Sequence, residues 1–181
     1  MTGRLRSTTE SLGYALGMVL LLLALAVPVG AAAEPGHGDL RAATARYQRV
    51  EAAIAAGYEL GYVNGDGVRI ITGCIANPEL GAMGYHYFNK ELIDDLIVDP
   101  LRPEGLVYES LPNGKLRLVS VEWVVPGEFA NPPGVTEAPT VLDREMTILV
   151  PAVGWYVAHA WIWKRNPSGL FANWNPDVEC P

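Results

Sequence analysis

GWYVAHAWIWK, at residues 154–164, predicts a long β-strand because it is rich in aromatic and β-branched residues. Successive side chains of a strand point to opposite faces of the sheet. One face of this strand would carry five side chains: Trp155, Val157, His159, Trp161 and Trp163. That face is apolar apart from a single imidazole. We therefore expect His159 either to be a core residue with hydrogen-bonded ring nitrogens or to lie in the wall of a pocket.

A second long strand, predicted at residues 115–125, follows the turn sequence PNG at residues 112–114. This turn would pair it with a strand at residues 106–109. Alternation places Leu116, Leu118, Ser120, Glu122 and Val124 on one face, and Arg117, Val119, Val121, Trp123 and Val125 on the other. Both faces are largely apolar, so we expect this strand to be central and covered on both sides.

Residues 39–56 predict one amphipathic helix. Its apolar residues recur at steps of three and four, at Leu40, Ala43, Tyr47, Val50 and Ile54. Further strands are expected at residues 58–63, 68–72, 85–88 and 146–150. The expected fold is therefore α+β, with an N-terminal amphipathic helix packed on a twisted, mainly antiparallel sheet. Partial closure of this sheet into a barrel is an alternative arrangement.

Residues 1–33 have the pattern of a secretory signal peptide. Arg4 and Arg6 precede an apolar run at residues 16–27, and small residues end at Ala33, after which we expect cleavage. Residues 34–38 would then be a flexible lead-in and residues 39–181 a single domain. The expected location is secreted or in the cell envelope. The alternative is a single N-terminal membrane anchor, because the uncharged stretch reaches the about 20 residues that a bilayer requires.

The net charge excludes some classes of binding partner, and the two cysteines indicate the cellular compartment. The formal net charge is −7, and no cluster of Lys or Arg is present in the sequence. Nucleic acid and anionic membrane surfaces are therefore not expected partners. The two cysteines, Cys74 and Cys180, are expected to form a disulfide in an exported chain. Two separate buried thiols are the alternative.

Four strings identify a resemblance: ATARYQ from Ala43, GAMGYHYFN from Gly81, DPLRPEGLVYE from Asp99 and WIWKRNPSGLFANWNP from Trp161. On these strings the chain resembles a family of small exported bacterial proteins, frequent in actinobacteria. The resemblance spans most of the chain after the signal peptide. It implies export and a bacterial origin, and it implies no activity.

Four polar residues lie in otherwise apolar strands: His86, Glu109, Glu122 and His159. Charged groups are seldom buried unless they are paired or bound to a metal. Two imidazoles and two carboxylates from different strands could converge on a divalent ion of zinc, manganese, iron or copper. Such a centre resembles the mixed His/Glu sites of cupin-type barrels. However, Phe88 stands where the second histidine of that motif would be.

The same four residues have a purely structural interpretation. The imidazoles could be hydrogen-bonded in the core, and the two glutamates could pair with Arg117, Arg144 or Lys164. Pairing of Glu109 with Arg117 or Lys115 across the PNG turn is the simplest case.

The aromatic residues favour a third hypothesis, in which the domain binds a small ligand. Flat rings with a few convergent polar groups are typical of ligand pockets. The residues that we expect to line such a pocket are Tyr85, His86, Trp155, His159 and Trp161. No G-x-S-x-G motif or other nucleophile pattern is present, so a non-enzymatic binding protein is the leading hypothesis. A hairpin edge that contacts protein partners is a further option.

Overall fold

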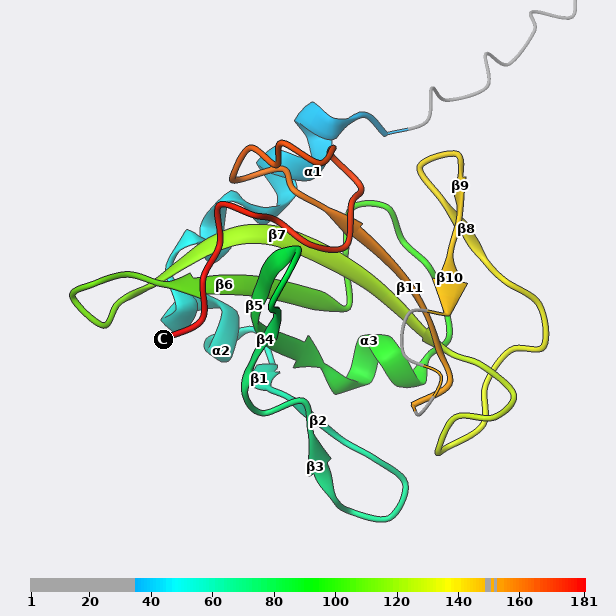
Figure 1. Ribbon diagram of the computed structural model, residues 1–181. Helices are drawn as coiled ribbons and strands as arrows, with labels where there is room; N and C mark the ends of the chain where they lie inside the picture. The colour runs from blue at the N-terminus through cyan, green and yellow to red at the C-terminus, as the bar shows by residue number, and fades with distance from the viewer. Residues whose placement is uncertain (1–34, 149–150, 152) are drawn as a thin grey trace, which may run out of the picture. The chain divides into compact units, whose positions relative to one another are not determined.

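A seven-stranded antiparallel sheet forms the centre of the fold in the computed structural model, which describes residues 35–148, 151 and 153–181 (Figure 1). Its main strands are β1 (Tyr58–Leu60), β4 (Cys74–Asn77), β5 (Gly81–Asn89), β6 (Gly105–Ser110), β7 (Leu116–Pro126), β10 (Thr147–Ile148) and β11 (Trp155–Ala160). The order is β1-β5-β6-β7-β11-β10, with β4 also paired to β5. The predicted signal peptide at residues 1–33 lies outside the described residues.

The sheet is open within the part of the chain that the structure describes. Its terminal strands β1 and β10 pair with β5 and β11 respectively, and not with each other. The partly closed barrel is therefore wrong, and a mixed α+β fold with a mainly antiparallel sheet is confirmed. Two small hairpins stand apart from this sheet: β2 (Tyr62–Val63) with β3 (Arg69–Ile70), and β8 (Thr140–Val141) with β9 (Arg144–Glu145).

Helical structure is short and divided. Residues 37–55 contain α1 (His37–Thr44), the 3-10 turn η1 (Ala45–Gln48) and α2 (Val50–Ala55), where the sequence predicts one continuous helix. The interruption lies at Arg49, whose backbone is extended at φ −100° and ψ 118°. The Tyr108 hydroxyl donates a hydrogen bond of 2.8 Å to the Tyr47 carbonyl, so this carbonyl has a partner beside the interruption. A fourth segment, α3 (Lys90–Asp94), begins after Asn89, whose side chain accepts from the backbone N–H groups of Glu91 and Leu92.

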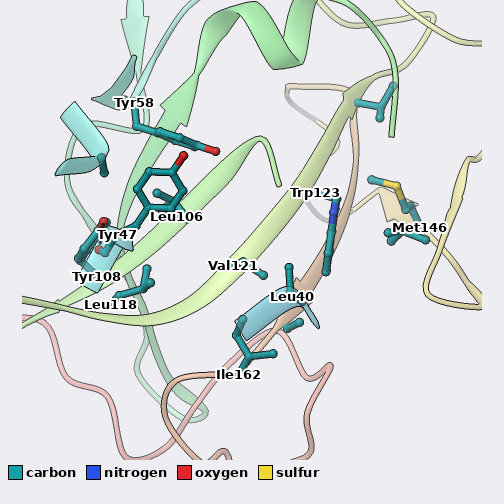
Figure 2. Close-up of a cluster of buried hydrophobic side chains, with 14 residues drawn as sticks. Leu40, Tyr47, Tyr58, Leu106, Tyr108, Leu118, Val121, Trp123, Met146 and Ile162 are labelled. Atoms are coloured by element: carbon teal, nitrogen blue, oxygen red, sulfur yellow. Dashed lines mark hydrogen bonds between the residues drawn. The ribbon is translucent and has the colours of Figure 1, made fainter. Parts of the chain in front are cut away.

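One face of the sheet packs against α1, η1 and α2 in a large cluster of buried apolar side chains. Figure 2 shows this cluster, with Tyr47, Tyr58 and Tyr108 grouped at one end and Trp123 and Met146 at the other. All five side chains are at most 5% exposed. The opposite face carries two smaller clusters of buried apolar side chains. The buried polar residues His86, Glu122 and His159 lie on this face as well.

A β-bulge changes the face pattern of β7. The β6–β7 register shifts between Val107 and Tyr108, which pair with Ser120 and Leu118, so Val119 is an extra residue. Leu118 consequently packs on the helix-side face, and Val119 packs on the opposite face. The uninterrupted alternation predicted for residues 115–125 is therefore wrong at this point.

The strand β11 is shorter than predicted. It ends at Ala160, and the N–H of Trp161 donates to the Leu170 carbonyl at 2.8 Å. The chain then turns, so Trp163 lies on the other face from Trp155. There its indole N–H donates to Thr44 Oγ1 at 3.1 Å, and the Arg41 guanidinium lies 4.4 Å from its ring centre.

The disulfide Cys74–Cys180 is present, and the structure contains no free cysteine in the described residues. It closes a sequence separation of 106 residues and joins the C-terminal tail to β4. Asn175 adds two backbone hydrogen bonds of 3.1 Å to Ala82 of β5. A disulfide is typical of an oxidising compartment. In the described segments, no helix has the length and apolarity that a membrane span requires.

Candidate metal centre

Three strands of the sheet, β5, β7 and β11, bring His86, Glu122 and His159 together on the face opposite α1 and α2. Glu122 of β7 and His159 of β11 are direct cross-strand partners. His86 lies on β5, which is separated from β7 by β6. Residue 105 of β6 stands opposite Glu122, and it is a glycine.

Gly105 makes the contact across β6 possible. A Cβ at this position would lie 3.1 Å from Glu122 Oε2 and 3.1 Å from Phe88 Cε1. Because glycine has no side chain, the Glu122 carboxylate can extend over β6 toward His86. The sequence therefore provides a gap in the sheet face where the three side chains meet.

The distances between the three groups are short. Glu122 Oε1 lies 3.3 Å from His159 Nε2, and Glu122 Oε2 lies 3.6 Å from His86 Nε2. One donor atom from each residue falls within 4.8 Å of the other two. The residues are also buried, with exposures of 3%, 4% and 1% for His86, Glu122 and His159.

Several polar atoms of this group have no hydrogen-bond partner in the described residues. They are His86 Nδ1, Glu122 Oε2, and both ring nitrogens of His159. Buried polar atoms without partners are rare, and a bound ion is one of their explanations. Glu122 Oε1 lies 3.3 Å from His159 Nε2, and the Asn173 side chain is close enough to influence the pKa of His159, so the interpretation of His159 as a core residue stays a prediction.

Burial changes the pKa values of all three residues. Removal from water raises the pKa of Glu122 to about 8, and the nearby Glu104 raises it further in the same direction. Burial lowers the pKa of His86 to about 3, with a smaller contribution from His159. Burial also lowers the pKa of His159 to about 4, against a partial offset from the Asn173 side chain. In the metal-free protein, burial therefore favours the uncharged form of each of the three side chains.

Glu104 is a buried acid that the sequence analysis does not single out. It is 1% exposed, and its Oε2 accepts a hydrogen bond of 3.0 Å from the Val124 N–H. Its other carboxyl oxygen has no partner in the described residues. Burial raises the pKa of Glu104 to about 8. In the sequence, the one indication that Glu104 could be buried is its position between Pro103 and Gly105, the first residue of β6.

Glu109 does not join this group, although the sequence analysis includes it among the candidate ligands. Its Oε1 accepts from Arg117 Nε at 2.6 Å, and its Oε2 accepts from Lys164 Nζ at 2.5 Å. The cross-strand pair with Arg117 is the structural alternative considered for this residue. Glu109 is thus satisfied by two cations and has no need of a metal.

A cavity of about 340 Å³ adjoins the group. His86 and Glu122 form part of its wall, and Trp155 and Trp174 form another part. His159 is not among the lining residues. Tyr85 and Trp161, which the sequence analysis places in a pocket, do not line this cavity either. Trp161 instead packs beside Val119 and Val178, and its indole N–H donates to the Ala172 carbonyl at 2.5 Å.

No family model, curated protein or solved structure matches this chain. The resemblance to small exported bacterial proteins therefore stays a prediction, and the site is interpreted from its own chemistry.

Replacing Gly105 by valine is expected to disturb the group directly. The new side chain would displace the Glu122 carboxylate or the Phe88 ring. Overpacking of this kind typically lowers the free energy of unfolding by about 1–3 kcal/mol, which urea denaturation can measure. Gly73→Val is the matched control, because nothing lies within 4 Å of a Cβ at that position. Equal stability losses for both variants would contradict the role of Gly105.

Proposed function

We propose that this protein is an exported metal-binding protein, whose His86, Glu122 and His159 hold one divalent transition metal ion beside a small-molecule cavity. The observation that carries the proposal is the set of three buried donors within 4.8 Å of one another. Four of their polar atoms also lack any hydrogen-bond partner among the described residues. A metal ion would provide the missing partner for the donor atoms that face it.

The donor set favours particular metals. Two imidazoles and one carboxylate suit zinc, iron, manganese or copper, whereas calcium and magnesium prefer oxygen donors alone. An ion held tetrahedrally at about 2.0–2.1 Å from each donor separates two donors by roughly 3.3 Å. The distance of 3.3 Å between Glu122 Oε1 and His159 Nε2 agrees with this geometry. Three protein donors leave a coordination position for a further ligand, as in catalytic centres.

Export is the second part of the proposal. The Cys74–Cys180 disulfide supports it, since disulfides persist mainly outside the cytoplasm. The signal-peptide pattern at residues 1–33 and the resemblance to exported bacterial proteins agree with it.

Metal analysis of the purified domain tests the proposal. We expect about one transition metal ion per chain after incubation with zinc and removal of loosely bound ions. Loss of an outer-shell group typically weakens metal binding about 10- to 100-fold. Removal of a direct ligand should weaken it more, and the three variants that test this are Glu122→Gln, His86→Ala and His159→Ala. The measurement is a competition titration against a coloured chelator.

Glu109→Gln is the matched control for Glu122→Gln. Both substitutions convert a buried carboxylate of the same sheet into an amide, but Glu109 pairs with Arg117 and Lys164. Glu109→Gln should therefore retain the metal. Absence of stoichiometric metal from the parent protein, or equal loss in both glutamine variants, would overturn the proposed centre.

A metal-free binding protein is the second candidate. A carboxyl that burial holds protonated can donate a hydrogen bond to a ligand oxygen in the cavity, and Glu122 with a pKa of about 8 fits this role. Glu122→Gln separates the two functions, because an amide keeps a donor for a neutral ligand but is a poor metal ligand.

A further inference from the structure

The cavity beside the candidate centre is apolar except at the wall that the centre provides. Ten described residues line it, and the polar ones among them are His86 and Glu122. Phe88, Trp155 and Val157 extend from the sheet, Ile75 lies on β4, and Trp174 lies on the tail. A ligand in this cavity would therefore meet polar protein groups at one end and hydrocarbon or aromatic surface elsewhere.

The net charge of the proposed metal centre indicates which polar group the ligand should carry. A divalent ion with one carboxylate and two neutral imidazoles carries a net charge of +1. A net charge in apolar, buried surroundings is costly unless an opposite charge accompanies it. None of the other lining residues is acidic. A ligand with one anionic oxygen donor would balance the charge and complete the coordination of the metal.

The volume of the cavity sets the size of the apolar part. A cavity of about 150 Å³ lined by apolar side chains holds one benzene molecule. The cavity of about 340 Å³ is somewhat more than twice as large. It should therefore accept roughly a dozen non-hydrogen atoms, as a short alkyl chain or two fused rings.

From these three observations we propose that the cavity binds a small monoanionic organic acid, with its carboxylate on the metal and its apolar body against Phe88, Trp155 and Trp174. This inference rests on the proposed metal centre and adds the chemical class of its ligand. Neutral alcohols of the same size lack the compensating charge, and acetate lacks the apolar body.

For the test, the protein is first freed of metal and then loaded with Co²⁺. The visible absorption of this ion changes when a ligand enters its coordination sphere. The probes are acetate, butanoate, hexanoate, octanoate and 2-naphthoate, with 1-octanol as the neutral counterpart of octanoate. We expect affinity to rise about fourfold for each added methylene, the fold-change that burial of one such group gives. Octanoate should bind at least tenfold more tightly than 1-octanol.

A variant that fills the cavity provides the matched control. Ile75→Trp places a larger side chain in the lining without altering any proposed ligand. It should keep the Co²⁺ spectrum and the weak response to acetate, and it should lose at least tenfold in affinity for octanoate. The chain-length series on the parent protein remains decisive if this variant does not fold.

The possible failures are distinguishable. No Co²⁺ spectrum at all would remove the metal centre and, with it, this inference. A normal Co²⁺ spectrum with equal responses to acetate and octanoate would overturn the ligand class and leave the metal centre standing. Equal binding of 1-octanol and octanoate would overturn the requirement for an anion.

Discussion

Replacing Cys74 and Cys180 by serine is expected to lower the free energy of unfolding by about 4 to 5 kcal/mol, as estimated for a loop of about 100 residues. The disulfide closes a sequence separation of 106 residues, so the unfolded chain gains much freedom when it is removed. The folded state also depends on it, because Val178 and Cys180 pack with Met83 and Trp161. Urea denaturation followed by tryptophan emission measures the difference.

Reduction of the parent protein is the control for this prediction. The reduced parent and the double serine variant should unfold at the same urea concentration, because both lack the same bond. A loss of stability below about 1 kcal/mol in either would show that the tail is held by packing and hydrogen bonds alone. The hydrogen bonds between Asn175 and Ala82 would then be the main attachment.

The metal-free protein is expected to lose stability as the pH rises from about 6.5 to 8. The pKa of Glu122 and that of Glu104 are raised to about 8 by burial, so each carboxyl favours folding fully below its unfolded pKa of about 4.3. This contribution is lost as the pH rises through the folded pKa of about 8. Between pH 6.5 and 8 the loss is on the order of 2 kcal/mol per carboxyl, at about 1.4 kcal/mol for each pH unit.

The two histidines act in the opposite direction. Burial lowers the pKa of His86 to about 3 and that of His159 to about 4, so their contribution is present above about pH 6.5 and lost as the pH falls. The opposing slopes nearly cancel between about pH 4.5 and 6.5, where the metal-free protein should be most stable. Thermal unfolding across pH 4 to 9 measures this profile.

Glu122→Gln is the informative variant for the pH profile. It removes one of the two titrating carboxyls, so its loss of stability between about pH 6.5 and 8 should be about half as steep as that of the parent. Bound zinc should have a similar effect, because the metal replaces the proton on Glu122. A parent protein that gains stability from pH 6.5 to 9 without metal would contradict the buried, protonated state of these acids.

The sequence contains enough information for the local pairings of the fold. Glu109 and Arg117 flank a short PNG turn, so their cross-strand contact follows from the hairpin alone. The apolar face that carries His159 is likewise visible in the alternation of residues 155–159. These features depend on neighbours in the sequence, and patterns of period two describe them well.

The site depends on contacts that no local pattern specifies. Glu122 meets His159 because β7 and β11 pair across an intervening segment of many residues, whose register the sequence does not state. His86 reaches Glu122 only because Gly105 leaves the intervening strand without a side chain. Of the four predicted ligands, Glu109 lies apart from the other three and pairs with Arg117 and Lys164. Glu104 lies just before the predicted strand at residues 106–109, so no alternation pattern indicates its burial.

The division of the site among β5, β7 and β11 has a consequence for folding. The β6–β7 hairpin closes a short loop and should form early, whereas β11 joins only after a longer and more costly loop closure. The donor atoms of His86 and His159 are thus far apart in any intermediate that lacks β11. A metal ion at the proposed centre would therefore bind only at the last stage of folding, and it would stabilise the folded state by holding three strands to one ion.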